Sequence, residues 1–334
     1  MLPDPRGELT AWLIGHLGQE VHGLASAPSP VVADPLADED AHLALYLCYE
    51  LHYRGFAGVS ARWEWEPSLL AWRAGLETRF EAAVLEAVGE PVKRCAPEEM
   101  DLALREIADS DDEPSLSVHM ERHASEQEFA EFFVHRSAYQ LKEADPHSWA
   151  LPRLGGAPKA ALVEIQADEY GGGRVQRMHA ELFAQSMEAV GLDRDYGAYV
   201  DVIPGFTLAT VNLMSLLGLH RRWIGAIVGH LALFEMTSSL PNRRYGDGLR
   251  RLGHGAGATA FFDEHVLADA VHENVAAVDL AGGLVRQDPD LAPDVLWGAR
   301  ALVELDARFA RRLLAAWEAR RTSLRRPLTV SVSV

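Results

Sequence analysis

Cysteine is scarce in this chain of 334 residues, which contains only Cys48 and Cys95. Two thiols cannot build a disulfide framework or a four-thiolate metal site. A disulfide between them is not expected, because the composition is otherwise that of a cytosolic protein. The first residues also lack the basic and then apolar pattern of a secretory signal peptide. We therefore expect a cytoplasmic protein that is not held together by cross-links.

Basic residues are also few relative to acidic ones. The chain has 31 Lys and Arg against 49 Asp and Glu, which gives a formal net charge of −18 at pH 7. Such a surface repels a phosphate backbone, and no cluster of Lys or Arg interleaved with aromatic residues offsets that charge. A nucleic-acid partner is therefore excluded, and the excess of acid is attributed to solubility.

Long uncharged runs are limited to one stretch, residues 202–219, which is just long enough to cross a bilayer. It contains Pro204, Gly205 and Asn212, so its mean hydropathy is modest. A second apolar run, residues 223–235, follows almost at once. Two helices packed in the centre of a large bundle explain this pattern better than a membrane hairpin. No membrane partner is expected.

The alternating pattern of β-strands is missing, and apolar residues instead recur at steps of three and four. We therefore predict an all-α fold. Beyond the two central runs, helices are expected over 41–53, 67–88, 117–144, 159–190 (interrupted by three glycines at 171–173), 261–284 and 299–320.

Proline, glycine and charge mark the breaks between these helices. Residues 238–248 (SSLPNRRYGDG) are predicted to be a loop after the central helices. The expected organisation is an N-terminal arm or loop at 1–37, a single helical domain over 38–322 and a tail at 323–334. A homodimer is expected, because the long apolar helices exceed what one bundle readily buries.

The triplet His265, Asp269 and His272 is the strongest candidate for chemistry. Positions i, i+4 and i+7 of a helix project within about 60° of one another. Two imidazoles and a carboxylate on one face suit iron or manganese, and zinc to a lesser degree. The alternative is a solvated polar face, but the flanking alanines and valines favour a helix that packs into a core.

One helix cannot complete a metal site, so other inward-facing ligands are needed. Glu169 and His179 would lie about 80° apart on an ideal helix, and the glycines at 171–173 would permit a distortion that brings them together. Glu143 ends the preceding helix, and Glu235 lies on an apolar helix where a carboxylate needs a partner.

Other motifs do not support a site. The paired E-x-x-H of ferritin-like bundles is absent, since only Glu39 and His42 fit and they lie in the leading loop. The glycine-rich stretch at 253–258 follows no strand, so a nucleotide site is not indicated. Neither a zinc-protease motif nor a nucleophile elbow is present.

The chain resembles the haem-oxygenase-like di-iron oxidases and oxygenases, the bacterial iron-containing redox enzymes. The resemblance rests on Glu143 in QLKEADP, Glu169 in IQADEYGGG, His179 in RMHAELF and the triplet in DEHVLADAVHEN, and it is close over residues 120–285. It implies a haem-oxygenase-like bundle of about seven core helices with extra N-terminal helices. Its implied ligands to two non-haem irons are Glu143, Glu169, His179, His265, Asp269 and His272.

The resemblance leaves some ligands open. Glu235 is either a seventh ligand or a residue that supports the ligands. Glu131 and Glu164 are nearby rivals of Glu143. Substrate-binding candidates are basic, and their alternative role is ordinary ion pairing in an acidic protein: His135, Arg136, Arg221, Arg222, Arg243 and Arg244.

The function that the resemblance implies is an O2-dependent di-iron oxygenase or oxidase that draws on an external electron donor such as a reductase or ferredoxin. We expect a small amine or amino-acid-like substrate and favour N-oxygenation in specialised metabolism. Oxidative C–C cleavage or decarboxylation of an amino or fatty acid is one alternative. A non-catalytic helical metal-binding protein and a true haem oxygenase are two others.

Overall fold

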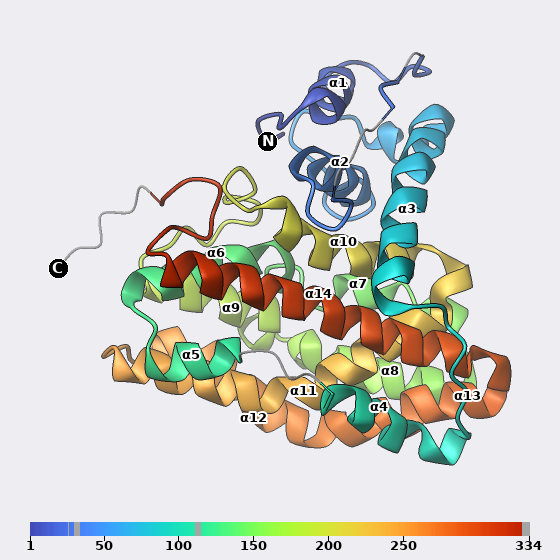
Figure 1. Cartoon of the computed structure of the whole chain (residues 1–334), viewed down its shortest axis with the longest axis vertical. Helices are drawn as coiled ribbons and strands as arrows, with labels where there is room; N and C mark the ends of the chain where they lie inside the picture. Colours follow the sequence, from blue (N-terminus) through green and yellow to red (C-terminus); the bar gives the residue numbers. More distant parts are fainter. Residues whose placement is uncertain (26, 30–33, 111–114, 329–334) are drawn as a thin grey trace.

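The computed structural model describes residues 1–25, 27–29, 34–110 and 115–328, with the side chains of 267–271 outside that description. Throughout this part of the chain the regular structure is helical and no strand occurs, as predicted (Figure 1). The helices are α1 Glu8–Leu17, α2 Glu39–Glu50, α3 Pro67–Val88, α4 Met100–Ala108, α5 Leu116–Arg122, α6 Glu126–Gln140, α7 Asp145–Ser148, α8 Gly156–Glu169, α9 His179–Ala189, α10 Gly205–Leu219, α11 Ile224–Arg251, α12 Ala256–Asn274, α13 Gly283–Gln287 and α14 Ala292–Glu318.

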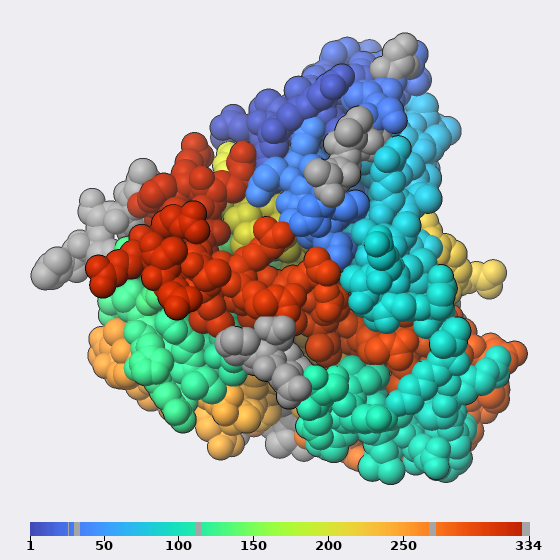
Figure 2. All heavy atoms as spheres, viewed as in Figure 1, coloured from blue at the N-terminus to red at the C-terminus, as the bar shows by residue number. Residues whose placement is uncertain are grey.

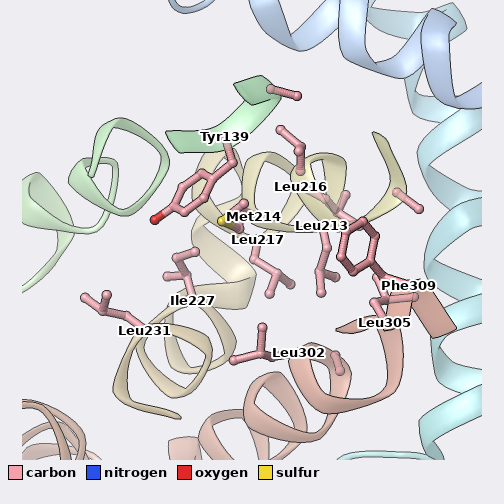
Figure 3. Packing of buried hydrophobic residues seen from close by; sticks show 14 of the residues in the cluster. Tyr139, Leu213, Met214, Leu216, Leu217, Ile227, Leu231, Leu302, Leu305 and Phe309 are labelled. Carbon is pink, nitrogen blue, oxygen red and sulfur yellow. The ribbon is translucent and has the colours of Figure 1, made fainter. Parts of the chain in front are cut away.

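The centre of the bundle is α11, which packs along α14 on one side and along α12 on the other. Helix α10 packs against α2 and also contacts α14. Figure 3 shows Leu213 and Leu217 of α10 facing Ile227 of α11 and Leu302 of α14. The apolar run at 202–219 thus forms a core helix, as predicted, because its side chains are buried against these neighbours.

Helix α11 overturns one sequence prediction. The sequence predicts a loop over residues 238–248, yet α11 continues through Pro241 to Arg251. Proline removes one backbone hydrogen bond, but packing on both sides of it holds the helix. Asn242 and Leu249 are buried, and Gly248 lies so close to α5 that a Cβ would come 2.4 Å from the carbonyl oxygen of Met120.

On length and composition alone, the helical stretch Arg221–Arg251 has one window apolar enough to cross a membrane, at a mean hydropathy of 1.2. In this fold 61% of that window is buried inside the protein. Its apolar side chains therefore have a partner in the bundle itself, which is how a core helix differs from an unpartnered span.

The N-terminal helices form a lobe at one end of the molecule, above α14 in the views of Figures 1 and 2. The arm expected at 1–37 includes a helix, α1, which buries Leu9, Leu13 and Leu17. The carboxylate of Asp40 accepts hydrogen bonds from the backbone of Leu9 and Thr10 and so fixes the start of α1 on α2.

Candidate metal centre

Six buried side chains from the sequence prediction are described, and they come from five parts of the fold. The turn after α6 supplies Glu143, the end of α8 supplies Glu169, and the start of α9 supplies His179. Helix α11 supplies Glu235, and α12 supplies His265 and His272. None of the six is more than 8% exposed. An acidic and imidazole-rich cluster therefore lies within the bundle, where unpaired charge is costly.

These residues form two groups that share one carboxylate. One nitrogen or oxygen from each of Glu143, Glu169, His179 and His265 lies within 4.8 Å of all the others. The same holds for Glu169, Glu235 and His272. Glu169 is common to both groups, so its carboxylate lies between the two sets of potential ligand atoms.

The glycines at 171–173 explain how Glu169 and His179 come together. All three have positive φ values, of 65°, 59° and 77°. They end α8 after Glu169, and α9 begins at His179, so the interruption predicted at the glycines is a complete break and the 80° offset of an ideal helix does not apply. Gly171 is required here, because a Cβ would lie 2.5 Å from the backbone carbon of Arg177.

Hydrogen bonds orient both histidines of α12. His265 donates from Nδ1 to the backbone carbonyl of Phe261 at 2.8 Å, so its Nε2 faces Glu143 Oε1 at 3.6 Å. The Nδ1 atom of His272 lies 3.2 Å from Glu235 Oε2, and its Nε2 lies 3.0 Å from Asp168 Oδ2. Each ring is thus held at one nitrogen while the other points at a carboxylate of the cluster.

The carboxylates of the cluster resist ionisation. Burial raises the pKa of Glu143, Glu169 and Glu235 above the usual range of a glutamate, and the nearby His265 and His272 offset only part of this increase. The positive charge near these three buried carboxylates is therefore too small to keep their pKa values in the usual range.

The histidines respond in opposite directions. Burial lowers the pKa of His179 to about 4, and the neighbouring His265 contributes to this decrease. Burial also disfavours a charged His272, but its hydrogen bonds to Glu235 and Asp168 outweigh this and raise its pKa to about 9. His179 is therefore neutral at pH 7, the form in which an imidazole binds a metal.

Two polar atoms of the cluster lack hydrogen bonds to the described residues. Glu143 Oε2 and His179 Nδ1 are both buried and unbonded, although His179 Nδ1 lies only 2.9 Å from Glu169 Oε2. Buried polar atoms are normally satisfied, so each exception requires an explanation. A cation bound between Glu143 and His179 would satisfy both atoms, so the residues present fit a metal.

Asp269, the middle residue of the predicted triplet, lies on α12, but its side chain is outside the described residues. The two rivals of Glu143 are elsewhere. Glu164 is exposed on α8, and Glu131 accepts hydrogen bonds from Trp317 and Ser323 in a separate buried network.

Of the predicted substrate-binding residues, only Arg136 lines the cavity beside the cluster. His135 is buried between the hydroxyls of Thr207 and Ser323. Arg221 and Arg222 are exposed, and Arg222 pairs with Glu81. The remaining two are also outside the cavity lining, namely Arg243 and Arg244.

A cavity of about 260 Å³ extends from Glu143 and His265 toward the surface. Its walls come mainly from α6, α11, α12 and α14 and include six aromatic side chains: Phe132, Phe183, Phe234, Tyr245, Phe261 and Phe262. Sequence reasoning missed this cavity and also Asp168. Only the position of Asp168 next to Glu169 could have drawn attention to it.

Comparison with known proteins identifies the family. A family profile described as iron-containing redox enzyme matches residues 130–307, which is more than half of the chain and includes all six buried residues and the whole triplet. The chain belongs to the iron-containing redox enzymes. The family and the haem-oxygenase-like helical fold are thus confirmed, and iron is the metal that the family implies.

A curated relative is the nitrosourea synthase of Streptomyces achromogenes subsp. streptozoticus, which is 29% identical over 171 residues. The match covers 49% of this chain and 36% of the relative, so the chain spans about a third of the relative's length in the alignment. Family and relative together support an oxidoreductase that acts on a small molecule.

Proposed function

We propose that this iron-containing redox enzyme is a non-haem di-iron oxygenase that uses O2 to oxidise a nitrogen of a small amine or amino-acid-like substrate in specialised metabolism. The observation that carries the proposal is the pair of buried ligand groups that share Glu169. A site for a single ion needs only one such group, whereas two groups that share a carboxylate suit two neighbouring ions.

The donor set favours iron over softer or harder metals. Carboxylates with imidazoles suit iron and manganese, whereas thiolates are absent from the cluster of described residues. The proposed ligands are Glu143, Glu169, His179 and His265 around one ion, and Glu169, Glu235, His272 and Asp269 around the other. Ferrous iron held by these residues would supply electrons for the activation of O2, and an external reductase or ferredoxin would return them.

The protein's own contribution is orientation and the exclusion of water. The carbonyl of Phe261 holds His265, and the carboxylate of Asp168 holds His272. Such outer contacts typically change metal affinity about 10- to 100-fold when they are removed. Six aromatic side chains line the space in front of Glu143, and such walls would limit the access of water to a reactive centre.

The relative's name supports oxidation at nitrogen, since a nitrosourea carries oxygen on a nitrogen atom. Oxidative cleavage of a carboxylic acid is the second candidate, and the apolar cavity walls together with Arg136 favour it. A panel of amines and acids, with product analysis by mass spectrometry, separates the two reactions.

Anaerobic titration with Fe(II) tests the proposal. We expect close to two irons per chain, and we expect Glu169→Ala to lose most of both because its carboxylate serves both groups. His272→Ala should retain one iron. Exposure of the loaded protein to O2 should give a transient absorbance change in stopped-flow measurements.

The matched control is Glu131→Ala, which removes a buried carboxylate outside the cluster and should leave the iron stoichiometry unchanged. Retention of a single iron by the unsubstituted protein would contradict the di-iron centre. Full iron loading of Glu169→Ala would contradict the shared role of Glu169.

A further inference from the structure

The cavity beside the metal centre has two chemically different ends. At the inner end are Glu143 and His265, whose side chains are 3% and 6% exposed. At the outer end are Arg136 and Asp306, whose side chains are 20% and 35% exposed. The rest of the lining is mainly apolar, with six aromatic side chains, and it also includes the polar residues Gln140, Thr237, Ser238 and Asn242. The cavity therefore carries a pair of opposite charges at one end and the proposed metal ligands at the other.

The outer pair is not closed by a direct hydrogen bond. Arg136 Nη1 lies 3.6 Å from Asp306 Oδ1, which is longer than a hydrogen bond. The guanidinium is positioned 4.6 Å from the ring centre of Phe309, which holds it beside the cavity. A fixed cation and a fixed anion at this spacing match the carboxylate and the ammonium of an amino acid.

Among the polar side chains that line the cavity, Gln140 has a buried acceptor atom with no hydrogen bond. Gln140 is 9% exposed and lines the cavity, and its Oε1 atom is buried without a hydrogen-bond partner in the described residues. An amide oxygen only accepts, so the group that satisfies it must carry an N–H or O–H.

The positions of the three residues set the length of a ligand. Arg136 and Gln140 are one helical turn apart on α6, and Glu143 follows after a tight turn in which its N–H donates to the carbonyl of Gln140. Ideal rises place Arg136 about 12 Å along the axis from Glu143. A molecule held by Arg136 thus reaches the metal ligands with the far end of its side chain and not with its α-nitrogen.

The residues that line the cavity indicate whether the side chain of the bound molecule is charged. Apart from Asp306 at the outer end and Glu143 at the inner end, no carboxylate lines the cavity among the described residues. The aromatic rings and the neighbouring Leu233, Leu302 and Val303 suit an uncharged body. A side chain with its own positive charge would have no ion-pair partner along the walls.

We infer that the cavity binds an α-amino acid whose charged head group lies between Arg136 and Asp306 and whose uncharged, aromatic side chain points at Glu143. An aryl amine is the form of such a side chain that offers an N–H to Gln140 and a neutral nitrogen to the metal centre. The reaction at this side chain rests on the proposed function, whereas the binding of the amino acid does not.

Isothermal titration calorimetry of the full-length protein under anaerobic conditions tests the inference. The probe is para-amino-L-phenylalanine, compared with para-aminophenethylamine, which lacks the carboxylate, para-aminophenylpropanoate, which lacks the ammonium, and L-arginine, whose side chain is charged. We expect the complete amino acid to bind at least about tenfold more tightly than each of the other three.

Two variants assign the ends of the head group. Arg136→Met should abolish the preference over the phenethylamine and keep the preference over the propanoate, and Asp306→Asn should do the reverse. The controls are Arg250→Met and Asp263→Asn, which alter a surface ion pair on α11 and α12 away from the cavity. Both controls should bind like the unsubstituted protein.

Tighter binding of L-arginine than of para-amino-L-phenylalanine would overturn the inference that the side chain of the ligand is uncharged. Unchanged preferences in Arg136→Met and Asp306→Asn would overturn the assignment of the head group. Because binding is measured without turnover, a failure here leaves the iron stoichiometry untouched, and a protein that binds the probe but takes up no iron contradicts the proposed function alone.

Discussion

Glu131 and Glu143 are two buried carboxylates, on α6 and in the turn that follows it, with opposite surroundings. Glu131 Oε2 accepts hydrogen bonds from Trp317 Nε1, from the backbone N–H of Ser323 and from its hydroxyl. Glu143 Oε2 has no hydrogen bond among the described residues. The first arrangement stabilises the fold, whereas the second is costly unless a cation is bound.

Replacement of each glutamate by alanine should therefore have opposite effects on the metal-free protein. Glu131→Ala should lower the free energy of unfolding by about 2–4 kcal/mol, because three buried donors lose a charged acceptor. Glu143→Ala should leave the stability unchanged or raise it, because it removes a buried carboxylate of which one oxygen has no hydrogen bond. Chemical denaturation in the presence of a chelator measures both, and equal losses in the two variants would contradict the distinction.

The crossing of α11 and α14 depends on two glycines. A Cβ on Gly229 would lie 1.8 Å from the carbonyl oxygen of Val295, and a Cβ on Gly298 would lie 2.0 Å from that of Ala226. The backbones of the two helices are therefore in direct contact where they cross. Glu235 lies on α11 beyond this crossing, so the helix contact also helps to position one carboxylate of the candidate metal centre.

We expect Gly229→Ala and Gly298→Ala each to destabilise the protein by about 1–3 kcal/mol, since the helices must move apart. Gly75→Ala is the matched control. Gly75 lies inside α3, and a Cβ there would meet no neighbouring atom within 4 Å, so alanine should stabilise the protein by about 0.5–1 kcal/mol. Thermal unfolding of the three variants gives the comparison, and a neutral result at Gly229 would contradict the close crossing.

At the scale of the whole molecule, buried neutral histidines predict how stability depends on pH. Burial lowers the pKa of His42 to about 4 and that of His135 to about 3, from 6.5 in each case. His42 receives a hydrogen bond from Asn212 at Nδ1 and bonds to the carbonyl of Pro35 through Nε2, so the folded protein has no place for a second proton on this ring.

The unfolded chain takes up protons below pH 6.5, whereas the folded protein does not until its lower pKa is reached. The contribution of these neutral histidines to the free energy of unfolding is therefore complete above pH 6.5. It is lost as the pH falls toward 4, by about 3 kcal/mol for His42 alone. Urea denaturation between pH 7 and pH 4.5 measures this slope. His42→Gln should flatten it, while His123→Gln, at an exposed position, should not.

The residues of the candidate site were largely predictable from the sequence, because their spacing on helices is a local property. His265 and His272 share a helix face, and Glu235 stands out in an apolar helix. The spacing could not show which of Glu131 and Glu143 belongs to the site, because both face the inside of the protein. Only their partners distinguish them, and Trp317 and Ser323 are distant in sequence.

The sequence by itself determined the helical class, the core position of residues 202–219 and most residues of the candidate site, because periodicity and composition act over a few turns. Tertiary structure decided that α11 runs through Pro241, that Glu169 belongs to both groups, and that an aromatic cavity joins Arg136 to Glu143. These features depend on contacts between helices far apart in the chain, whose burial outweighs the local preference of a proline or a glycine.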